Sequence, residues 1–281
     1  MIAIPQILGC DVAGVVKEAD ANSKFKVGDR VVGDTAQILK DPWGTYAELC
    51  SCKEELLTRI PEGVSFEQAA AMPIAGLTAW QALAPSMPLA GKRVLVHGGA
   101  GGIGHFAVQI AKTQGAYVAT TCSGRNEEFV TQVLGADLAI DYTKGEKLAD
   151  VAGEPYDLVV DLVGAEPESW KVLKRSGRMA AVSWDKMVKG KSGFALVATI
   201  LRRMLRLKMA SALRLCPKYD AIQQEFEPDK GLSQLLQLAA EGKVRVHIDR
   251  VMGLEQIPEA HEVLEKGGVR GKIVITTSAA S

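Results

Sequence analysis

The sequence lacks a net charge, a long apolar run and a secretion signal. Its 281 residues carry 33 Lys+Arg against 33 Asp+Glu, so it has no basic excess of the kind that a main nucleic-acid partner requires. The strongest candidate for a membrane span, residues 194–201, has only eight residues, whereas a spanning helix needs about 20. The chain does not open with a basic and then an apolar segment, as a secretion signal would. These absences argue against a nucleic-acid-binding, membrane-spanning or secreted protein.

Cysteines are few and odd in number. The five are Cys10, Cys50, Cys52, Cys122 and Cys216. A scattered, odd set does not form the disulfide framework of a small secreted domain and favours a reducing compartment. With 47% hydrophobic and 23% charged residues, the composition is otherwise that of a soluble globular protein. The length corresponds to about two domains.

Residues 1–85 are expected to form a β-rich domain. Short strands are predicted at 12–17, 30–32 and 46–50, where β-prone runs are separated by turn signals containing glycine. Ser65 and Gln68 have the spacing of a capping box at the start of an Ala-rich helix. Pro73 is expected to divide that helix from a second one.

From residue 92 onward, apolar strands alternate with helices. Strands are predicted at 93–97, 117–121, 138–140, 158–163 and 179–182, with helices at 103–113 and 126–134. Strands that are apolar along their whole length and joined by helices indicate a parallel sheet covered on both faces. The prediction is an α/β fold with a doubly wound parallel sheet, followed by a helix at 232–240 and a last strand at 272–276.

The clearest motif is a glycine-rich loop between the first of these strands and its helix. Gly99, Gly101 and Gly104 have the spacing G-x-G-x-x-G. Glycines at these positions permit a tight turn, a close approach to a pyrophosphate and the packing of helix on strand. The helix amino terminus also presents N–H groups to phosphates. We expect a dinucleotide here and regard a glycine turn without a nucleotide as the weaker alternative.

The end of the second strand favours NADP(H) over NAD(H). NAD sites place Asp or Glu there to bind the ribose 2′-hydroxyl, but this chain has Ser123 and Arg125. A charge-assisted hydrogen bond to phosphate contributes about 1.5–3 kcal/mol. Ser123 and Arg125 are therefore predicted to hold the 2′-phosphate, and the alternative is that Arg125 is a solvated loop charge.

A basic segment at 186–219 contains nine basic residues and no acidic ones. At helical spacing, Arg202, Arg203 and Arg206 share one face, opposite an apolar face. This pattern allows peripheral membrane contact through 194–214. The preferred interpretation is a helix that covers a substrate cleft or a dimer interface, because surface helices are generally amphipathic.

Several sequence blocks recur in the order of one enzyme family. They are LGCDVAGVV at 8–16, FKVGDRV at 25–31, GTYAE at 44–48, AGLTAW at 75–80 and the glycine loop, with Gly91, Lys92, Gln109 and Lys112 around it. Together they resemble the quinone oxidoreductase/zeta-crystallin family of medium-chain dehydrogenases/reductases. Residues 121–126 and 134–137 resemble its plant-type, chloroplast-envelope and reticulon-interacting branch most.

This resemblance implies a GroES-like substrate domain at 1–85, completed by 246–281, and a Rossmann NADP-binding domain at 86–245. It implies an NADPH-dependent oxidoreductase, dimeric and either cytoplasmic or organellar (mitochondrion or chloroplast), that transfers hydride to quinones or α,β-unsaturated carbonyls such as alkenals. Catalytic residues are not assigned. The implied cofactor-binding residues are Thr78, Gly99, Ala100, Gly101, Gly102, Ile103, Gly104, Ser123, Arg125, Tyr142, Val163, Gly164 and Lys272.

The sequence departs from the family at two places. Where zinc-dependent relatives carry a His-Glu pair and a four-cysteine lobe, this chain has Cys10-Asp11 and only Cys50-Ser51-Cys52, so no zinc site is expected. Family members also carry several dozen residues before the Leu8-Gly9 motif, so the GroES-like domain is expected to be incomplete at its amino terminus. This second departure keeps open an alternative function, an NADPH-binding regulatory or scaffold protein without turnover.

Overall fold

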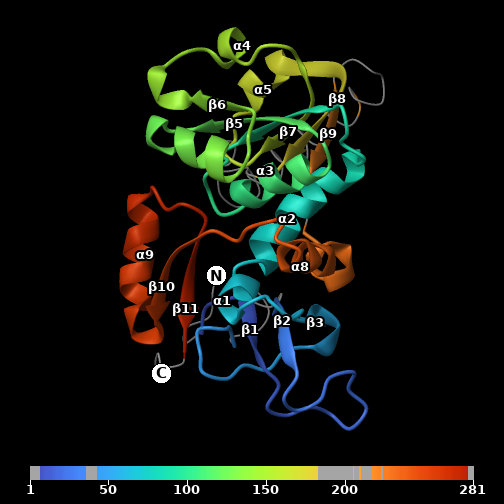
Figure 1. Cartoon of the computed structure of the whole chain (residues 1–281), viewed down its shortest axis with the longest axis vertical. Coiled ribbons are helices and arrows are strands. Elements are labelled where there is room, and N and C mark those ends of the chain that lie inside the picture. Colours follow the sequence, from blue (N-terminus) through green and yellow to red (C-terminus); the bar gives the residue numbers. More distant parts are fainter. Residues whose placement is uncertain are drawn as a thin grey trace. The chain divides into compact units, whose positions relative to one another are not determined.

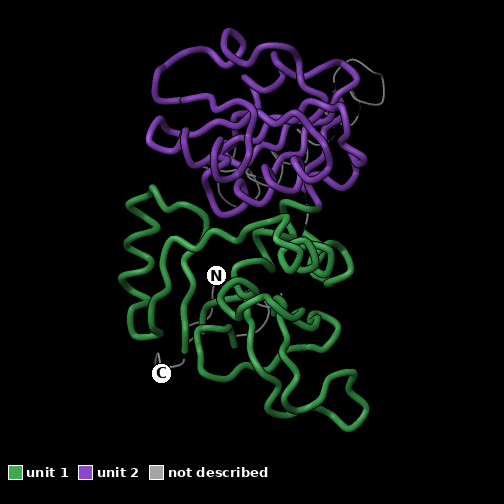
Figure 2. The backbone as a smooth tube through the Cα atoms, in the orientation of Figure 1, with its two compact units in different colours: residues 1–80, 224–281 green, residues 81–223 purple. Residues whose placement is uncertain are grey.

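A computed structural model describes residues 7–35, 43–182, 217–222 and 224–277, together with Leu205 and Met209. The chain forms two compact units, residues 81–223 and residues 1–80 with 224–281 (Figure 2). The predicted membrane-contact segment 194–214 lies outside the described residues except for Leu205 and Met209. Within the described ranges, no helix has the length and apolar character of a membrane span.

The unit at 81–223 is built on a six-stranded parallel sheet (Figure 1). Its strands are β4 (Arg93–His97), β5 (Tyr117–Cys122), β6 (Leu138–Asp141), β7 (Tyr156–Asp161), β8 (Leu173–Ala181) and β9 (Lys218–Ala221). The order is β6-β5-β4-β7-β8-β9, so the chain runs outward from β4 to β6 and then outward in the other direction from β7. This order confirms the predicted doubly wound α/β fold.

Helices α3 (Gly104–Thr113), α4 (Leu148–Val151) and α5 (Glu166–Val172) follow β4, β6 and β7. Central strands β4 and β7 are buried over most of their length, and Leu95, Val159 and Met179 share one apolar cluster between sheet and helices. The continuous apolar runs therefore arise because helices exclude water from the sheet.

The helix predicted at 126–134 is not a regular α-helix. A 3-10 turn at Gly124–Asn126 is followed by a π-helical turn at Phe129–Val133, in which the Leu134 N–H donates to the Phe129 carbonyl at 3.1 Å. The hydroxyl of Thr131 donates to the Glu127 carbonyl at 2.8 Å and so competes for the acceptor of an α-helical bond.

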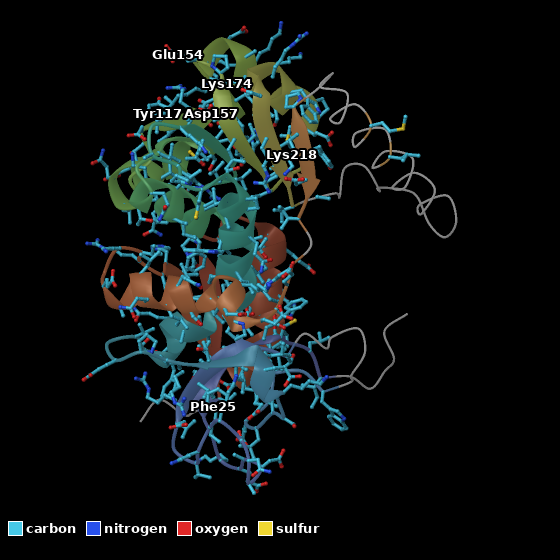
Figure 3. The ribbon with its side chains drawn as sticks, turned by 90° about the vertical axis from the view of Figure 1, so that its right-hand side faces the viewer. Phe25, Tyr117, Glu154, Asp157, Lys174 and Lys218 are labelled. Atoms are coloured by element: carbon cyan, nitrogen blue, oxygen red, sulfur yellow. The ribbon has the colours of Figure 1, made fainter. Side chains whose placement is uncertain are left out.

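The amino-terminal edge of the same sheet carries a polar and aromatic cluster (Figure 3). The guanidinium of Arg93 lies 4.0 Å from the ring centre of Tyr117, and its Nε donates to the Glu154 carbonyl at 3.3 Å. Asp157 accepts from the Arg93 N–H and from Lys174 Nζ, both at 2.9 Å. These contacts fix the strand ends opposite the glycine loop.

The other unit contains two small sheets. Strands β1 (Asp11–Val15), β2 (Arg30–Asp34) and β3 (Leu57–Arg59) are antiparallel. Strands β10 (Ile248–Gly253) and β11 (Lys272–Thr276) are parallel and connected through α9 (Ile257–Lys266). The capping box is confirmed at the start of α1 (Phe66–Ala70), where Ser65 Oγ accepts from the Gln68 N–H. Pro73 begins α2 (Pro73–Leu83), as predicted.

The strand predicted at 46–50 is wrong. Residues 45–49 form successive bends, because the segment hydrogen bonds to residues 7–9 in an irregular order. The Thr45 N–H donates to the Gly9 carbonyl at 3.2 Å, whereas the Tyr46 N–H donates to the Leu8 carbonyl at 2.9 Å. The sequence analysis also missed strand β3.

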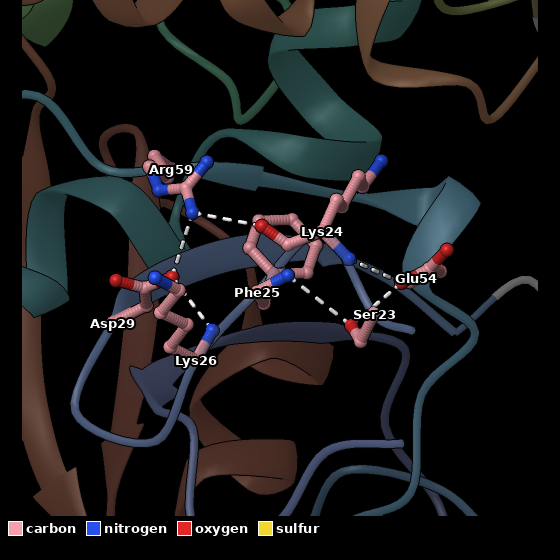
Figure 4. A network of polar contacts seen from close by, with 7 residues as sticks. All are labelled: Ser23, Lys24, Phe25, Lys26, Asp29, Glu54 and Arg59. Carbon is pink, nitrogen blue, oxygen red and sulfur yellow. Dashed lines mark hydrogen bonds and ion pairs between the residues drawn. The ribbon is translucent and has the colours of Figure 1, made fainter. Parts of the chain in front are cut away.

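A polar network closes the loop between β1 and β2 onto β3 (Figure 4). Arg59 donates to Asp29 at 2.8 Å and to the Lys24 carbonyl at 2.9 Å. Glu54 accepts from the Ser23 hydroxyl at 2.6 Å. Phe25, buried at 5% exposure, is covered by these polar groups, so the network is a structural feature of this sheet.

Residues 224–245, assigned by the sequence analysis to the Rossmann domain, group with the unit that contains β1–β3. Within that unit, α8 (Leu232–Ala240) packs closely on α2. Gly76 of α2 leaves room for Leu235 of α8, because a Cβ added to Gly76 would lie only 2.1 Å from Leu235 Cδ2. Ser233 Oγ is also 3.5 Å from Thr58 Oγ1.

Candidate nucleotide site

The predicted cofactor residues of the six-stranded unit lie in the segments that follow β4, β5, β6 and β7. Register places His97 beside Thr121, Cys122 beside Asp141, and Val96 beside Val160. All four strands are parallel, so their carboxyl ends meet at one edge of the sheet. The strand order reverses between β4 and β7, and ligands of open α/β sheets bind at such a switch point.

The glycine loop is sterically possible only with glycine at two of its positions. A Cβ added to Gly99 would lie 2.0 Å from Thr120 Oγ1, and one added to Gly104 would lie 2.1 Å from the Gly98 carbonyl oxygen. A Cβ on Gly101 would meet only the Gly98 carbonyl oxygen, at 3.3 Å. Gly99 and Gly104 therefore serve the tight turn, while a side chain at Gly101 would meet a single, less severe contact.

This loop fits the pyrophosphate of a dinucleotide. It leads directly into α3, whose amino terminus carries a partial positive charge. Of the first-turn N–H groups, that of His105 already donates to the Gly101 carbonyl at 3.1 Å, so the donors left for a ligand come from the loop residues before it. Ala100 is buried, whereas Gly101, Gly102 and Ile103 are partly exposed. Backbone donors and open space therefore coincide at the start of α3.

A buried hydrogen-bond relay connects the glycine loop to the segment after β7. The Gly98 N–H donates to Thr121 Oγ1 at 3.0 Å, and Thr121 Oγ1 is 3.2 Å from His97 Nδ1. His97 Nε2 is 2.9 Å from Ser169 Oγ, which in turn donates to the Ala165 carbonyl at 2.9 Å. His97 and Ser169 are 3% and 0% exposed, so water does not satisfy these groups.

The relay assigns a neutral tautomer to His97. Because Ser169 uses its hydroxyl hydrogen on Ala165, it accepts from His97, and Nε2 must carry the proton. Nδ1 then accepts from the Thr121 hydroxyl. An imidazolium would donate from both nitrogens and leave the Thr121 hydrogen without this acceptor. His97 is therefore a positioning residue of the loop.

The segment after β7 is organised by Asp161. Its Oδ1 accepts from the Val163 N–H at 3.1 Å and from the Ala165 N–H at 3.0 Å. Gly164 follows in a left-handed conformation, with φ of 71°. A Cβ on Gly98 would lie 3.2 Å from Val163 Cγ1, so Val163, 42% exposed, adjoins the glycine loop.

Ser123 and Arg125 lie on the turn that follows β5. Ser123 is partly exposed, and its Oγ accepts from the Asn126 side chain at 3.2 Å. Arg125 is exposed. Burial, with Glu127 as a further cause, raises the pKa of nearby Cys122 to about 11, so its thiol adds no negative charge. Both residues thus follow the end of β5, at the same edge of the sheet as the glycine loop.

The sequence analysis missed a carboxylate beside this turn. Asp141, at the end of β6, places Oδ2 2.7 Å from where a Cβ on Gly124 would lie. Its Oδ1 accepts from the side chain and backbone of Thr143 at 2.7 and 2.9 Å, and these bonds lower the pKa of Asp141. The anion is used within the protein to fix the turn. Tyr142 follows it and is 65% exposed.

Thr78 and Lys272, the remaining predicted cofactor residues, belong to the other unit. The Thr78 hydroxyl is buried and donates to the Ile74 carbonyl at 2.7 Å. Lys272 Nζ lies 3.7 Å from Asp11 Oδ2, while Asp11 Oδ1 accepts from the Ile74 N–H at 2.9 Å. Burial raises the pKa of Asp11 despite the opposing effect of Lys272.

The positions that replace the zinc ligands of relatives are also in that unit. Burial, together with Asp34 and Asp11, raises the pKa of Cys10 to about 12, so Cys10 is a neutral thiol at physiological pH. Among the described residues, no group of three or more His, Cys, Asp or Glu side chains is arranged to hold a metal ion.

Comparison with known proteins gives the family. The family model described as "Zinc-binding dehydrogenase" matches residues 134–275, and the model described as "Alcohol dehydrogenase GroES-like domain" matches residues 1–62. A mitochondrial NAD(P)H oxidoreductase RTN4IP1 of Danio rerio is 32% identical, over 97% of this chain and 72% of its own length. A chloroplast envelope quinone oxidoreductase homolog of Arabidopsis thaliana is 34% identical, over 96% and 80%.

Solved structures agree with this classification. The quinone oxidoreductase from Coxiella burnetii is 33% identical, with a TM-score of 0.82 over 98% of this chain and 80% of its own. A mycobacterial protein complexed with NADPH is 25% identical, with a TM-score of 0.75 over 97% and 83%. The chain belongs to the quinone oxidoreductase-like family of medium-chain dehydrogenases/reductases, and its fold combines a Rossmann-like sheet with a GroES-like domain. It is an oxidoreductase.

Ser169→Ala tests the relay. The change leaves the Nε2–H of buried His97 without its acceptor, which costs about 1–3 kcal/mol. Urea unfolding should show this loss, whereas Ser176→Ala, at an exposed position of β8, should change the free energy of unfolding by less than about 0.5 kcal/mol. Equal effects of the two variants would contradict the relay.

Gly101→Ala and Gly99→Ala separate the ligand role of the loop from its steric role. Gly99→Ala forces Thr120 to move and should lower the free energy of unfolding by about 1–3 kcal/mol. Gly101→Ala should lower stability less than Gly99→Ala does, because its one close contact is at 3.3 Å, but it should weaken NADPH binding at least tenfold, a loss of about 1.4 kcal/mol, in a fluorescence titration. Wild-type affinity in a folded Gly101→Ala variant would argue against a pyrophosphate at this loop.

Proposed function

We propose that the chain is an NADPH-dependent reductase that transfers hydride to quinones or to α,β-unsaturated carbonyl compounds without zinc. The observation that carries the proposal is the glycine loop at the β4–β7 switch point, with Ser123 and Arg125 after the neighbouring strand. The names of similar proteins support the proposal. One relative is named a quinone oxidoreductase homolog. Another, from Arabidopsis thaliana, is named NADPH-dependent alkenal/one oxidoreductase and is 41% identical over 64% of this chain and 47% of its own length.

In this proposal each part of the site has a separate task. The loop at 98–104 and the start of α3 bind the pyrophosphate, and Ser123 and Arg125 bind the 2′-phosphate. The segment at 163–164, fixed by Asp161 and the His97 relay, borders the nucleotide near the switch point. Bound NADPH supplies a hydride for an electrophilic carbon. The roles of Thr78, Tyr142 and Lys272 stay predictions from the family resemblance.

Zinc independence is supported by the chemistry of the residues at the former ligand positions. A zinc site needs three or four ligands held together, and among the described residues no group of three or more His, Cys, Asp or Glu side chains surrounds Cys10. Asp11 is already engaged by the Ile74 N–H and Lys272. Activation of the acceptor then depends on positioning and on proton supply from water or a side chain. The expected dimer and organellar or cytoplasmic location stay predictions.

Arg125→Ala tests cofactor choice. Loss of the guanidinium should weaken NADPH binding about 10- to 100-fold, corresponding to about 1.5–3 kcal/mol for a charge-assisted bond, while NADH affinity stays within about twofold. Parallel fluorescence titrations with both nucleotides measure the ratio, and Arg175→Ala, an exposed arginine on β8, is the matched control. A variant that keeps wild-type discrimination would remove Arg125 from the site.

Turnover and metal content test the remainder of the proposal. Protein purified without added zinc should oxidise NADPH in the presence of a quinone or a 2-alkenal, contain only trace metal by elemental analysis, and keep its rate in EDTA. Tight NADPH binding without turnover on any acceptor of these classes would instead indicate a regulatory or scaffold protein. Activity that EDTA abolishes and zinc restores would contradict zinc independence.

A further inference from the structure

Cys50 and Cys52 form a close pair of thiols in a segment without helix or strand structure. Their Sγ atoms are 3.6 Å apart and share a hydrogen bond. Cys50 is exposed and Cys52 is partly exposed. Neither cysteine belongs to the nucleotide site or to the Cys10–Asp11 position, so the proposed reductase activity gives the pair no role.

The two thiols differ in acidity because one stabilises the other's anion. With Cys52 donating its S–H to the sulfur of Cys50, the thiolate of Cys50 is favoured, and its pKa falls to about 7. The same interaction, together with burial, raises the pKa of Cys52. Cys50 is also the more exposed of the two thiols, so we assign it as the nucleophile and Cys52 as the neutral thiol beside it.

The other described cysteines provide an internal contrast. The pKa values of Cys10 and Cys122 are raised to about 12 and about 11, mainly by burial. Near pH 7, Cys50 therefore carries more thiolate than Cys10 or Cys122. Since the thiolate is the reactive form, we expect Cys50 to react with peroxide and alkylating agents faster than Cys122.

A metal site explains the pair less well. Two thiolates bound to one tetrahedral zinc ion would lie about 3.8 Å apart, close to the observed separation. Zinc needs further ligands, however, and the described residues contain no group of three or more metal-ligating side chains. A low-pKa, accessible thiol with a second thiol beside it is instead the arrangement of cysteines that undergo reversible oxidation.

We propose that Cys50 and Cys52 are a redox pair that hydroperoxides oxidise to an intrachain disulfide. The Cys50 thiolate attacks the terminal oxygen of the hydroperoxide, the O–O bond breaks, and the alkoxide or hydroxide leaves with a proton from solvent. Cys50 is then a sulfenic acid. The sulfur of Cys52 attacks the sulfur of Cys50, forming the S–S bond and releasing water. The two thiols together lose two electrons and two protons, and the hydroperoxide is reduced to alcohol or water.

The geometry permits this closure. The Sγ atoms must approach from 3.6 Å to about 2.05 Å, a movement of less than 1 Å for each. Residues 50–53 have neither helical nor strand structure, and three of these four residues are exposed, so the segment is free of a regular ladder that would oppose the movement.

The test oxidises the full-length reduced chain with stoichiometric hydrogen peroxide at pH 7, alkylates the remaining thiols and analyses the peptides by mass spectrometry. The peptide with residues 50–52 should lose two alkylation sites and two hydrogens, and a thiol reductant should restore both. Cys52→Ser should stop at a sulfenic acid at position 50, detected with dimedone. Cys50→Ser should prevent oxidation of Cys52, and Cys122→Ser should behave like wild type.

Two results would overturn the proposal. One is that Cys50 and Cys52 stay alkylatable in folded wild-type protein while Cys10 or Cys122 is oxidised first. The other concerns the rates of iodoacetamide alkylation, measured against pH. We expect Cys50 to reach half its maximal rate near pH 7 in the folded protein, and we expect all cysteines to react alike in denaturant. A Cys50 rate within about threefold of Cys122 in the folded protein would exclude an activated pair. NADPH binding, measured in parallel, reports on the proposed function separately.

Discussion

The turn from β4 into α3 is the constraint on which the site depends. The backbone of Gly98 approaches Gly104 so closely that a side-chain carbon at residue 104 would overlap the Gly98 carbonyl. The same turn is anchored to β5, because the N–H groups of Gly98 and Gly99 both donate to the Thr121 carbonyl at 3.1 Å. Since β5 carries Ser123 and Arg125 at its end, the two phosphate-binding elements of the proposal are held by one set of bonds.

Four polar side chains around this turn bond to groups inside the protein. His97 and Ser169 use their hydrogens on neighbouring acceptors, and Asp161 and Asp141 each bind backbone N–H groups of the segments that follow. Unsatisfied buried polar groups would cost about 1–3 kcal/mol each. The loops therefore gain a fixed geometry without a ligand, which limits the ordering cost of binding one.

Much of the fold could be predicted from the sequence because local and global signals agree in the Rossmann half. In that half, local sequence signals predict the apolar strands at 93–97 and 117–121 and the glycine-rich turn, and the structure has each of them. In the other unit, the capping box at Ser65 also has a local cause and is present. The segment at 45–49 could not be predicted, because its β-prone residues bond irregularly to residues 7–9. The π-helical turn at 129–133 was likewise missed, because the apolar pattern of the segment does not distinguish it from an α-helix and the bond from Thr131 to the Glu127 carbonyl depends on the side-chain conformation.

The residues of the candidate site also divide into those that could be predicted from the sequence and those that could not. The glycine loop, Ser123 and Arg125 follow from spacing along one βαβ unit. The His97 relay and the carboxylate of Asp141 require knowledge of strand register: Thr121 pairs with His97, and Asp141 with Cys122, only once β4, β5 and β6 are aligned. The close thiol pair was visible as C-x-C, but its hydrogen bond and its unequal acidities depend on side-chain placement.

The division of the chain into units has a consequence for biosynthesis. Residues 81–223 are continuous, whereas the unit around them needs both ends of the chain: Asp11 of β1 meets Lys272 of β11, and α8 packs on α2. On a ribosome, the inserted unit can fold as soon as β9 has emerged, whereas the unit that holds β1 to β3 is completed only when β10 and β11 have been translated. The half that carries the thiol pair therefore stays incomplete for longer during synthesis than the half that carries the glycine loop.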